Sequence, residues 1–159
     1  GSWDPRGPER WDDWDVPLPA WGTSPGEVVV LATRHIGPEG IAEPHGWLNR
    51  LLPDLRRRWP AVRVRAHPGE GHNPVPLEED LKGAAGVVTW GSGGALKALL
   101  MGLPVWYGFD QWIGRAAGVP VAKFPALPLE DRRLDMFRAL AWAVWEVGEI
   151  ETGIPFARL

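Results

Sequence analysis

Short apolar runs alternate with helix-like patterns along most of the chain. The run Val28–Ala32 is the clearest, because uninterrupted apolar residues rich in valine are typical of a buried parallel strand. Similar runs predict four more strands: Ala61–Ala66, Gly86–Thr89, Pro104–Tyr107 and Val119–Phe124. Apolar residues spaced three and four apart predict the intervening helices: His45–Arg58, Leu77–Ala85, Gly94–Met101, Gln111–Ala117 and Leu129–Glu149. Pro53 is expected to kink or split the first of these helices.

Strands that alternate with helices at this spacing predict one parallel sheet with right-handed crossovers. We therefore expect an α/β fold, with a single Rossmann-like parallel sheet of about five strands flanked by helices. This domain is predicted to span residues 26–159. Residues 1–25 are rich in proline and tryptophan, and we expect them to form an extended arm whose tryptophans dock on the domain. The first two residues, Gly1 and Ser2, resemble a cloning remnant.

Composition narrows the classes of function. The chain has no cysteine and only four scattered histidines, so we expect no disulfide and no metal site. No apolar run approaches the roughly 20 residues of a membrane span, and no signal peptide is visible, so a cytoplasmic protein without a membrane partner is expected. The net charge of −3 gives no general attraction to nucleic acid. A local basic surface from Arg56, Arg57, Arg58 and Arg63 leaves contact with DNA open.

Polar residues and glycines gather where the predicted strands end. Parallel sheets bind ligands beyond the carboxyl ends of their strands, so these residues are candidates for one site. Arg34 and His35 follow the first strand, and Arg65 and His67 lie at the end of the second. Asp110 follows the fourth strand, where it would either orient an acceptor hydroxyl or cap a helix. Each histidine is a candidate for ligand binding or acid–base chemistry, with an ordinary loop histidine as the alternative.

The third strand runs into the strongest motif, a glycine-rich loop followed by a helix. Its sequence TWGSGGALK contains Gly91, Ser92, Gly93 and Gly94, and Lys97 follows in the first helical turn. Glycines let the backbone approach a phosphate closely, and a helix start offers N–H groups to an anion. The loop matches neither the P-loop nor the dinucleotide-binding fingerprint. We expect an anion site here, and the alternative is a tight turn capped by serine.

The stretch HPGEGHNPVPLEEDLKGAAGVVTWGSGGALKALLMGLPVWYG, residues 67–108, resembles the nucleotide-sugar-binding half of GT-B glycosyltransferases. The resemblance implies that His67 and the Ser92–Gly94 loop contact the phosphates of a nucleotide sugar. Lys97 stands where that family usually has glutamate, which favours contact with phosphate over contact with ribose. GT-B enzymes have two such domains, so the resemblance also implies that a second one comes from elsewhere. We therefore expect a homo-oligomer with arm tryptophans at the contact.

The whole chain also looks like small glycosyltransferase-like proteins of bacteriophages, some of which modify hydroxymethylated DNA bases. The resulting hypothesis is a glycosyltransferase that moves a sugar from a nucleotide-sugar donor to an acceptor hydroxyl. A hydroxymethylated base of phage DNA is the candidate acceptor, and no cofactor is expected beyond the donor. His67, His35 and Asp110 are the candidate catalytic residues. Two alternatives stay open: a non-catalytic protein that binds a nucleotide or nucleotide sugar, and a subunit of a larger transferase complex.

Overall fold

The computed structural model describes residues 9–22, 24–69 and 75–157. The chain forms two compact units, which are described separately below. One unit is the continuous segment Leu18–Asp131. The other combines the two ends of the chain, Gly1–Pro17 and Arg132–Leu159. Residues 1–8, residue 23 and part of the quoted motif, residues 70–74, lie outside the described residues.

The larger unit contains a five-stranded, fully parallel sheet in the order β2-β1-β3-β4-β5. The strands are β1 Val28–Leu31, β2 Val62–Arg65, β3 Gly86–Thr89, β4 Val105–Tyr107 and β5 Val119–Pro120. The expected α/β fold with a Rossmann-like parallel sheet is therefore confirmed. The chain crosses from β2 over β1 to β3, so the strand order reverses between β1 and β3. In doubly wound sheets, ligands bind at such a switch point.

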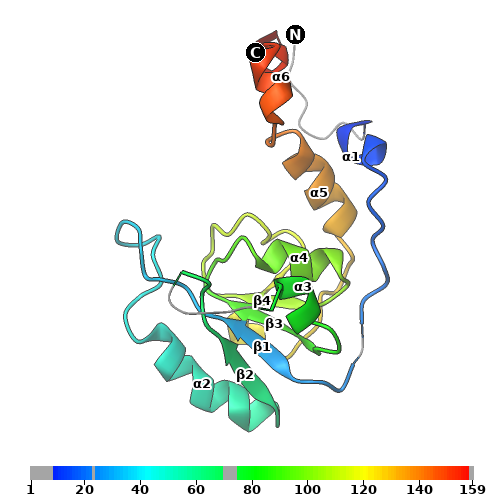
Figure 1. Ribbon diagram of the computed structural model, residues 1–159. Helices are drawn as coiled ribbons and strands as arrows, with labels where there is room; N and C mark the ends of the chain where they lie inside the picture. Colours follow the sequence, from blue (N-terminus) through cyan, green and yellow to red (C-terminus); the bar gives the residue numbers. More distant parts are fainter. Residues whose placement is uncertain (1–8, 23, 70–74, 158–159) are drawn as a thin grey trace. The chain divides into compact units, whose positions relative to one another are not determined.

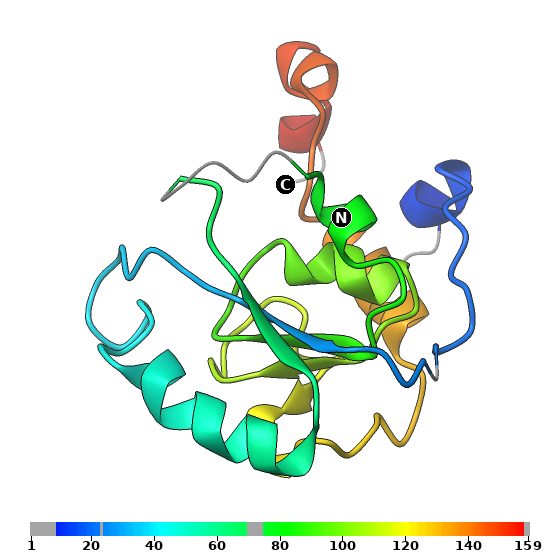
Figure 2. The ribbon, with the colours of Figure 1, turned by 60° about the horizontal axis from the view of Figure 1, so that its bottom comes forward.

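Helices cover both faces of the sheet, and this explains why the inner strands β1, β3 and β4 are mostly apolar, whereas the edge strand β2 alternates valine with arginine. Helix α2 (Trp47–Arg58) lies on one face, while α3 (Leu77–Asp80) and α4 (Ala95–Leu100) lie on the other (Figures 1 and 2). Every residue of β1 is buried, since alternate side chains enter the two layers. Val28 and Val30 share a core cluster with Leu55 of α2.

Several predicted elements are shorter than the sequence pattern suggests. Helix α3 ends at Asp80 rather than Ala85, and Gly83 then adopts a left-handed φ of 77°. Strand β5 ends at Pro120, which has no N–H to extend the ladder, and the 3₁₀ turn η1 (Val121–Lys123) follows. The helix predicted over residues 111–117 is a series of turns. Helix α2, by contrast, is not split at Pro53, which lies exposed inside it.

The smaller unit is helical. It contains α1 (Glu9–Asp13), α5 (Arg133–Ala141), α6 (Val147–Glu151) and α7 (Ile154–Ala157). Helix α1 forms inside the segment expected to be extended, because residues 9–16 contain no proline. The long helix predicted over residues 129–149 is instead two helices, α5 and α6, with a break between them.

The break between α5 and α6 is held by Arg10 of α1. Its guanidinium donates hydrogen bonds to the carbonyl oxygens of Ala141 and Val144, each at 2.8 Å. It also pairs with both carboxylate oxygens of Glu149 and lies 4.3 Å from the ring centre of Trp145. Carbonyls at the end of a helix need such partners, and Arg10 supplies them from the other end of the chain.

Candidate functional site

A cavity of about 380 Å³ lies at the carboxyl ends of β1, β3 and β4. It therefore occupies the switch point at which ligands bind in sheets of this type. Its volume lies within the range of about 300–1,000 Å³ that is usual for small-molecule sites. The lining combines polar groups from the strand ends with an apolar rim: Thr33, Arg34, Ile36, Ile41, Ala42, Glu43, His67, Trp90, Gly91, Ser92, Gly93 and Phe109.

The glycine-rich loop after β3 is held by its own hydroxyl groups. The amide of Ser92 donates to Thr89 Oγ1 at 2.9 Å, and the amide of Gly94 donates to Ser92 Oγ at 3.1 Å. The first amides of the short helix α4 bond to carbonyls of the same loop, so they are not free as the sequence suggests. Among the described residues, the amide of Gly93 has no acceptor. This amide, rather than the start of α4, is available to a ligand.

Gly93 leaves room for a ligand beside the loop. A Cβ added to Gly93 would meet no atom of the described residues within 4 Å, whereas a Cβ on Gly91 would touch the ring of Phe109 at 3.3 Å. Gly93 thus borders open space at the cavity, and its missing side chain is not needed for the fold. This is the arrangement in which a backbone can approach a phosphate directly.

Arg34 places a positive charge at the cavity. Its side chain is exposed, and within the described parts of the chain its guanidinium forms neither an ion pair nor a hydrogen bond. The guanidinium lies beside Gly69, because a Cβ there would be 3.0 Å from Arg34 Nη1. An arginine that is not paired within the protein keeps its N–H donors for a ligand, and their planar geometry suits phosphate or carboxylate.

His67 lines the cavity next to Arg34, and its hydrogen bonding fixes its tautomer. The Gly69 amide, which can only donate, lies 3.0 Å from His67 Nδ1. His67 Nδ1 must therefore accept, so the proton of the neutral ring is on Nε2. His67 can then donate a hydrogen bond to an anion from Nε2, which suits a binding role better than that of a proton acceptor.

A smaller cavity of about 190 Å³ lies beyond His67 and Ser92, which line both cavities. Arg65 lines this second cavity, but its guanidinium is engaged by the protein. It pairs with the carboxylate of Asp80 and donates to the carbonyl oxygen of Val75 at 2.7 Å. Arg65 is buried, as expected of an arginine with internal partners, so its charge is largely compensated.

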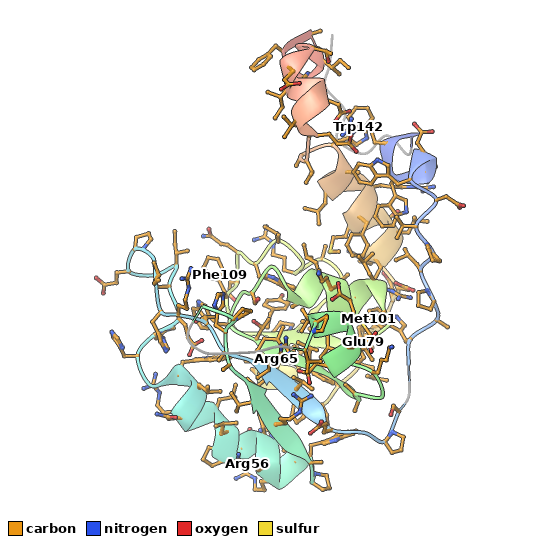
Figure 3. The ribbon with its side chains drawn as sticks, viewed as in Figure 1. Arg56, Arg65, Glu79, Met101, Phe109 and Trp142 are labelled. Carbon is orange, nitrogen blue, oxygen red and sulfur yellow. The ribbon has the colours of Figure 1, made fainter. Side chains whose placement is uncertain are left out.

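Two aromatic rings form one side of the larger cavity. Trp90 stacks on Phe109, which is labelled in Figure 3, with their ring centres 5.9 Å apart. Trp90 also donates from its indole nitrogen to the carbonyl oxygen of Ile41 at 2.9 Å, which ties the loop after β1 to the loop after β3. Such a wall suits a flat or apolar ligand group, such as a base or a sugar face.

Glu43 is the residue of this site that the sequence reasoning missed. It lies in a loop rich in glycine and proline, yet it is only 4% exposed and lines the cavity. Thr33 Oγ1 donates to Glu43 Oε2 at 2.7 Å, while Glu43 Oε1 is buried and has no hydrogen-bond partner among the described residues. The one available signal was a pair of carboxylates, Glu39 and Glu43, in the loop directly after a buried strand, and the sequence does not show which of them is buried.

Three predicted site residues do not line either cavity. Lys97 pairs with Glu78 at 2.5 Å, and this hydrogen bond lowers the pKa of the Glu78 carboxyl. Asp110 is exposed. The partial burial of Tyr107 and the negative charge of Asp110 raise the pKa of the Tyr107 hydroxyl. His35 contacts Glu43 rather than the cavity itself. The structure thus brings together Arg34, His67 and the loop from Gly91 to Gly93, while Gly94 lines the smaller cavity.

Comparisons with known protein families, with curated proteins and with solved structures found no significant match to this chain. Within the described residues, no cluster of three or more acidic or histidine side chains is arranged to hold a metal ion. A search of the same residues found no helix with the length and apolar character that crossing a bilayer requires. The cavity is therefore the main indication of function in this chain.

Proposed function

We propose that this protein binds a nucleotide sugar in the cavity between β1 and β3 and transfers the sugar to an acceptor hydroxyl. The observation that carries the proposal is the meeting of three anion-binding groups at one cavity. Arg34 supplies a cation, His67 a ring N–H and Gly93 a backbone N–H. A phosphate group accepts hydrogen bonds from all three kinds of donor.

The remaining lining residues suit a ligand that carries other chemical groups besides an anion. Trp90 and Phe109 offer an aromatic surface, and Glu43 and Thr33 offer polar groups on the other elements around the cavity. A phosphate joined to a sugar and a base combines these features in one molecule. The resemblance of residues 67–108 to nucleotide-sugar-binding domains points to the same class of ligand.

A protein that only sequesters a nucleotide sugar needs the phosphate site but no proton acceptor. The buried carboxylate of Glu43 beside the cavity favours transfer, because a negative charge there does not help to bind an anion and therefore points to a further role. Arg34 and His67 would stabilise the charge that develops on the leaving phosphate. These two groups account for departure of the nucleotide.

A thermal-shift screen tests the binding part of the proposal. The full chain is titrated with CMP, UDP, GDP and their sugar conjugates, with inorganic phosphate and the free sugars as controls. A ligand present at 100 times its Kd adds about 2.7 kcal/mol to the free energy of unfolding. We expect the sugar conjugates to stabilise more than phosphate alone. Stabilisation by none of the nucleotides, or equal stabilisation by phosphate, would contradict the proposal.

The DNA acceptor stays a prediction, and the structure offers it less basic surface than the sequence suggests. Arg57 and Arg58 pair with Asp54, and Arg63 pairs with Glu27 and Asp80. The test is incubation with hydroxymethylcytosine or hydroxymethyluracil DNA and each donor, followed by digestion and mass spectrometry. A hexose-sized gain identifies DNA as the acceptor. No gain with a donor that binds would exclude these bases.

A further inference from the structure

The two histidines near the cavity, His35 and His67, are held in opposite tautomers, because each contacts a backbone group that can only accept or only donate a hydrogen bond. His35 Nδ1 lies 3.2 Å from the backbone carbonyl oxygen of Glu43, which can only accept a hydrogen bond. For this contact to be a hydrogen bond, Nδ1 of His35 must carry the proton, which leaves a free lone pair on Nε2. His67 is the reverse, because its Nδ1 accepts from the Gly69 amide and its proton is on Nε2.

The side chain of Glu43 reinforces the orientation of His35. Within the part of the chain that the structure describes, Glu43 Oε1 has no hydrogen bond, and it lies 3.8 Å from His35 Nδ1. A buried carboxylate oxygen without a donor is costly, so a small movement of the imidazole toward Oε1 is favourable. Thr33 fixes the other oxygen, Oε2, and thereby sets the direction in which Oε1 points. His45 stacks on the His35 ring at 5.7 Å between ring centres and limits its rotation.

The backbone of His35 is also unusual. Its φ is 54°, in the left-handed region that residues other than glycine seldom adopt, at a cost of about 1–2 kcal/mol. Such conformations persist where surrounding contacts hold them, and they concentrate at functional sites. The neighbours of His35 in the chain, Arg34 and Ile36, line the cavity, as does Glu43, which the imidazole contacts, and the His35 side chain is 37% exposed.

We propose that His35 is the general base of the transfer reaction and that Glu43 is the residue that positions it. This inference rests on the proposed function and divides its chemistry between the histidines. His35 Nε2 takes the proton of the acceptor hydroxyl as that oxygen bonds to the anomeric carbon of the sugar. The bond from that carbon to the phosphate oxygen breaks, and the nucleotide leaves with the electron pair, held by Arg34 and the Nε2–H of His67. His35 then releases its proton to water.

The tautomers can be measured without any ligand. Long-range ¹H–¹⁵N NMR on the full chain labelled at histidine distinguishes Nδ1–H from Nε2–H in neutral rings, and H35Q and H67Q assign the signals. We expect Nδ1–H for His35 and Nε2–H for His67. E43Q keeps the backbone carbonyl but removes the nearby carboxylate charge, so the population of Nδ1–H at His35 should fall without reversing. E39Q, which removes a carboxylate from the same loop, should leave it unchanged. An Nε2–H tautomer for His35 in the unmodified protein overturns the proposal.

Kinetics with the nucleotide sugar that gives the largest thermal shift supply the second readout. H35Q should lower kcat by about 10²–10⁴-fold while the Kd of the donor stays within twofold, since a general base contributes about that much. E43Q should lower kcat, and E43D should partly restore it, because a shorter carboxylate still orients the ring. Unchanged kcat in H35Q overturns the proposal even when the donor binds. If no donor binds, the proposed function is rejected. The NMR experiment still shows whether His35 carries its proton on Nδ1.

Discussion

The hydroxyl oxygen of Thr89, the last residue of β3, accepts the amide hydrogen of Ser92 at 2.9 Å. This bond closes the glycine-rich loop directly at the end of its strand. Ser92 repeats the pattern by accepting the Gly94 amide on its own hydroxyl. The loop is therefore ordered by the protein itself, and the Gly93 amide between these two bonds is left for a ligand.

Replacing Gly93 with valine should abolish nucleotide binding and leave the fold intact. A Cβ at this position meets no atom within 4 Å in the described parts of the chain, so a branched side chain would project into the open space beside the cavity. We expect an affinity loss of about 100-fold or more, which corresponds to about 2.7 kcal/mol, by calorimetry. G93A should lose less.

Gly86 provides the matched control, because there a side chain should affect stability. A Cβ at Gly86 would lie 2.5 Å from the ring of Trp106 and 2.9 Å from the Pro104 carbonyl oxygen. G86A should destabilise the protein by about 1–3 kcal/mol through overpacking. Full affinity in G93V, or a melting temperature as low as that of G86A, would rule out the assigned role of Gly93.

Removing Arg34 should weaken binding of any phosphate-bearing ligand. R34A loses charge-assisted hydrogen bonds worth about 1.5–3 kcal/mol, which corresponds to about a 10- to 150-fold rise in Kd. R56A removes the same charge from the end of α2, outside the cavity lining (Figure 3), and should bind normally. Titration calorimetry with the best nucleotide compares the two variants. Equal losses would mean that Arg34 acts only through net charge.

Asp80 should contribute to stability in a pH-dependent way. Burial raises the pKa of Asp80, but hydrogen bonds from Arg63 and Arg65 and their charges lower it more, so the folded pKa lies below the ordinary value. The contribution is therefore complete above the unfolded pKa of about 3.9 and is lost as the pH falls through the lower folded pKa. D80N should lower the free energy of unfolding by about 2–3 kcal/mol at neutral pH, which lies between the usual contributions of exposed and buried ion pairs.

Urea unfolding between pH 7 and pH 3 measures this contribution. The difference in free energy of unfolding between the unmodified protein and D80N should narrow as the pH falls below about 4. E79Q is the control, because Glu79 is exposed and, among the described residues, its carboxylate pairs only with Lys82. A difference that stays constant with pH would show that the carboxylate charge of Asp80 is not what stabilises the fold.

Trp11 should be the tryptophan on which the smaller unit depends. It is buried and stacks on Phe137 of α5 with ring centres 4.9 Å apart, whereas Trp14 is 40% exposed. W11A should cost about 3 kcal/mol, near the lower end for buried aromatic residues, and W14A clearly less. Hydrogen exchange at the amides of α5 should increase in W11A. Similar protection of α5 in both variants would contradict this assignment.

The expected homo-oligomer can be tested with the same two variants. The sequence predicts arm tryptophans at a contact between subunits, and Trp14 is the more exposed of the two. Light scattering of the unmodified chain should give a mass above that of a monomer, and W14A should reduce it. A monomer at high micromolar concentration would exclude the predicted assembly.

The sequence predicts the sheet well because the pattern that indicates each strand lies within the strand's own residues. A run such as Val28–Leu31 is apolar throughout because helices cover both faces, and this information lies within the run itself. The predicted ends of the strands were accurate enough to place Arg34, His67 and the glycine-rich loop at one edge, and the cavity lies there.

What the sequence could not predict depends on partners far away in the chain. The break between α5 and α6 is held by Arg10, and nothing near residue 141 indicates that an arginine 131 positions earlier will bond to its carbonyl. Glu43 was missed for a similar reason, because its burial depends on Thr33 and on the loop that Trp90 holds. Lys97 was expected to bind phosphate, but its ammonium group instead forms an ion pair with Glu78 of α3.

The division of the chain into its two units has a practical consequence for engineering. The unit with the candidate site is one unbroken stretch, Leu18–Asp131, so it can be isolated by two cuts without joining any ends. The helical unit is assembled from two stretches that are far apart in the sequence, so deleting α1 and deleting α6 with α7 would each remove part of the same unit.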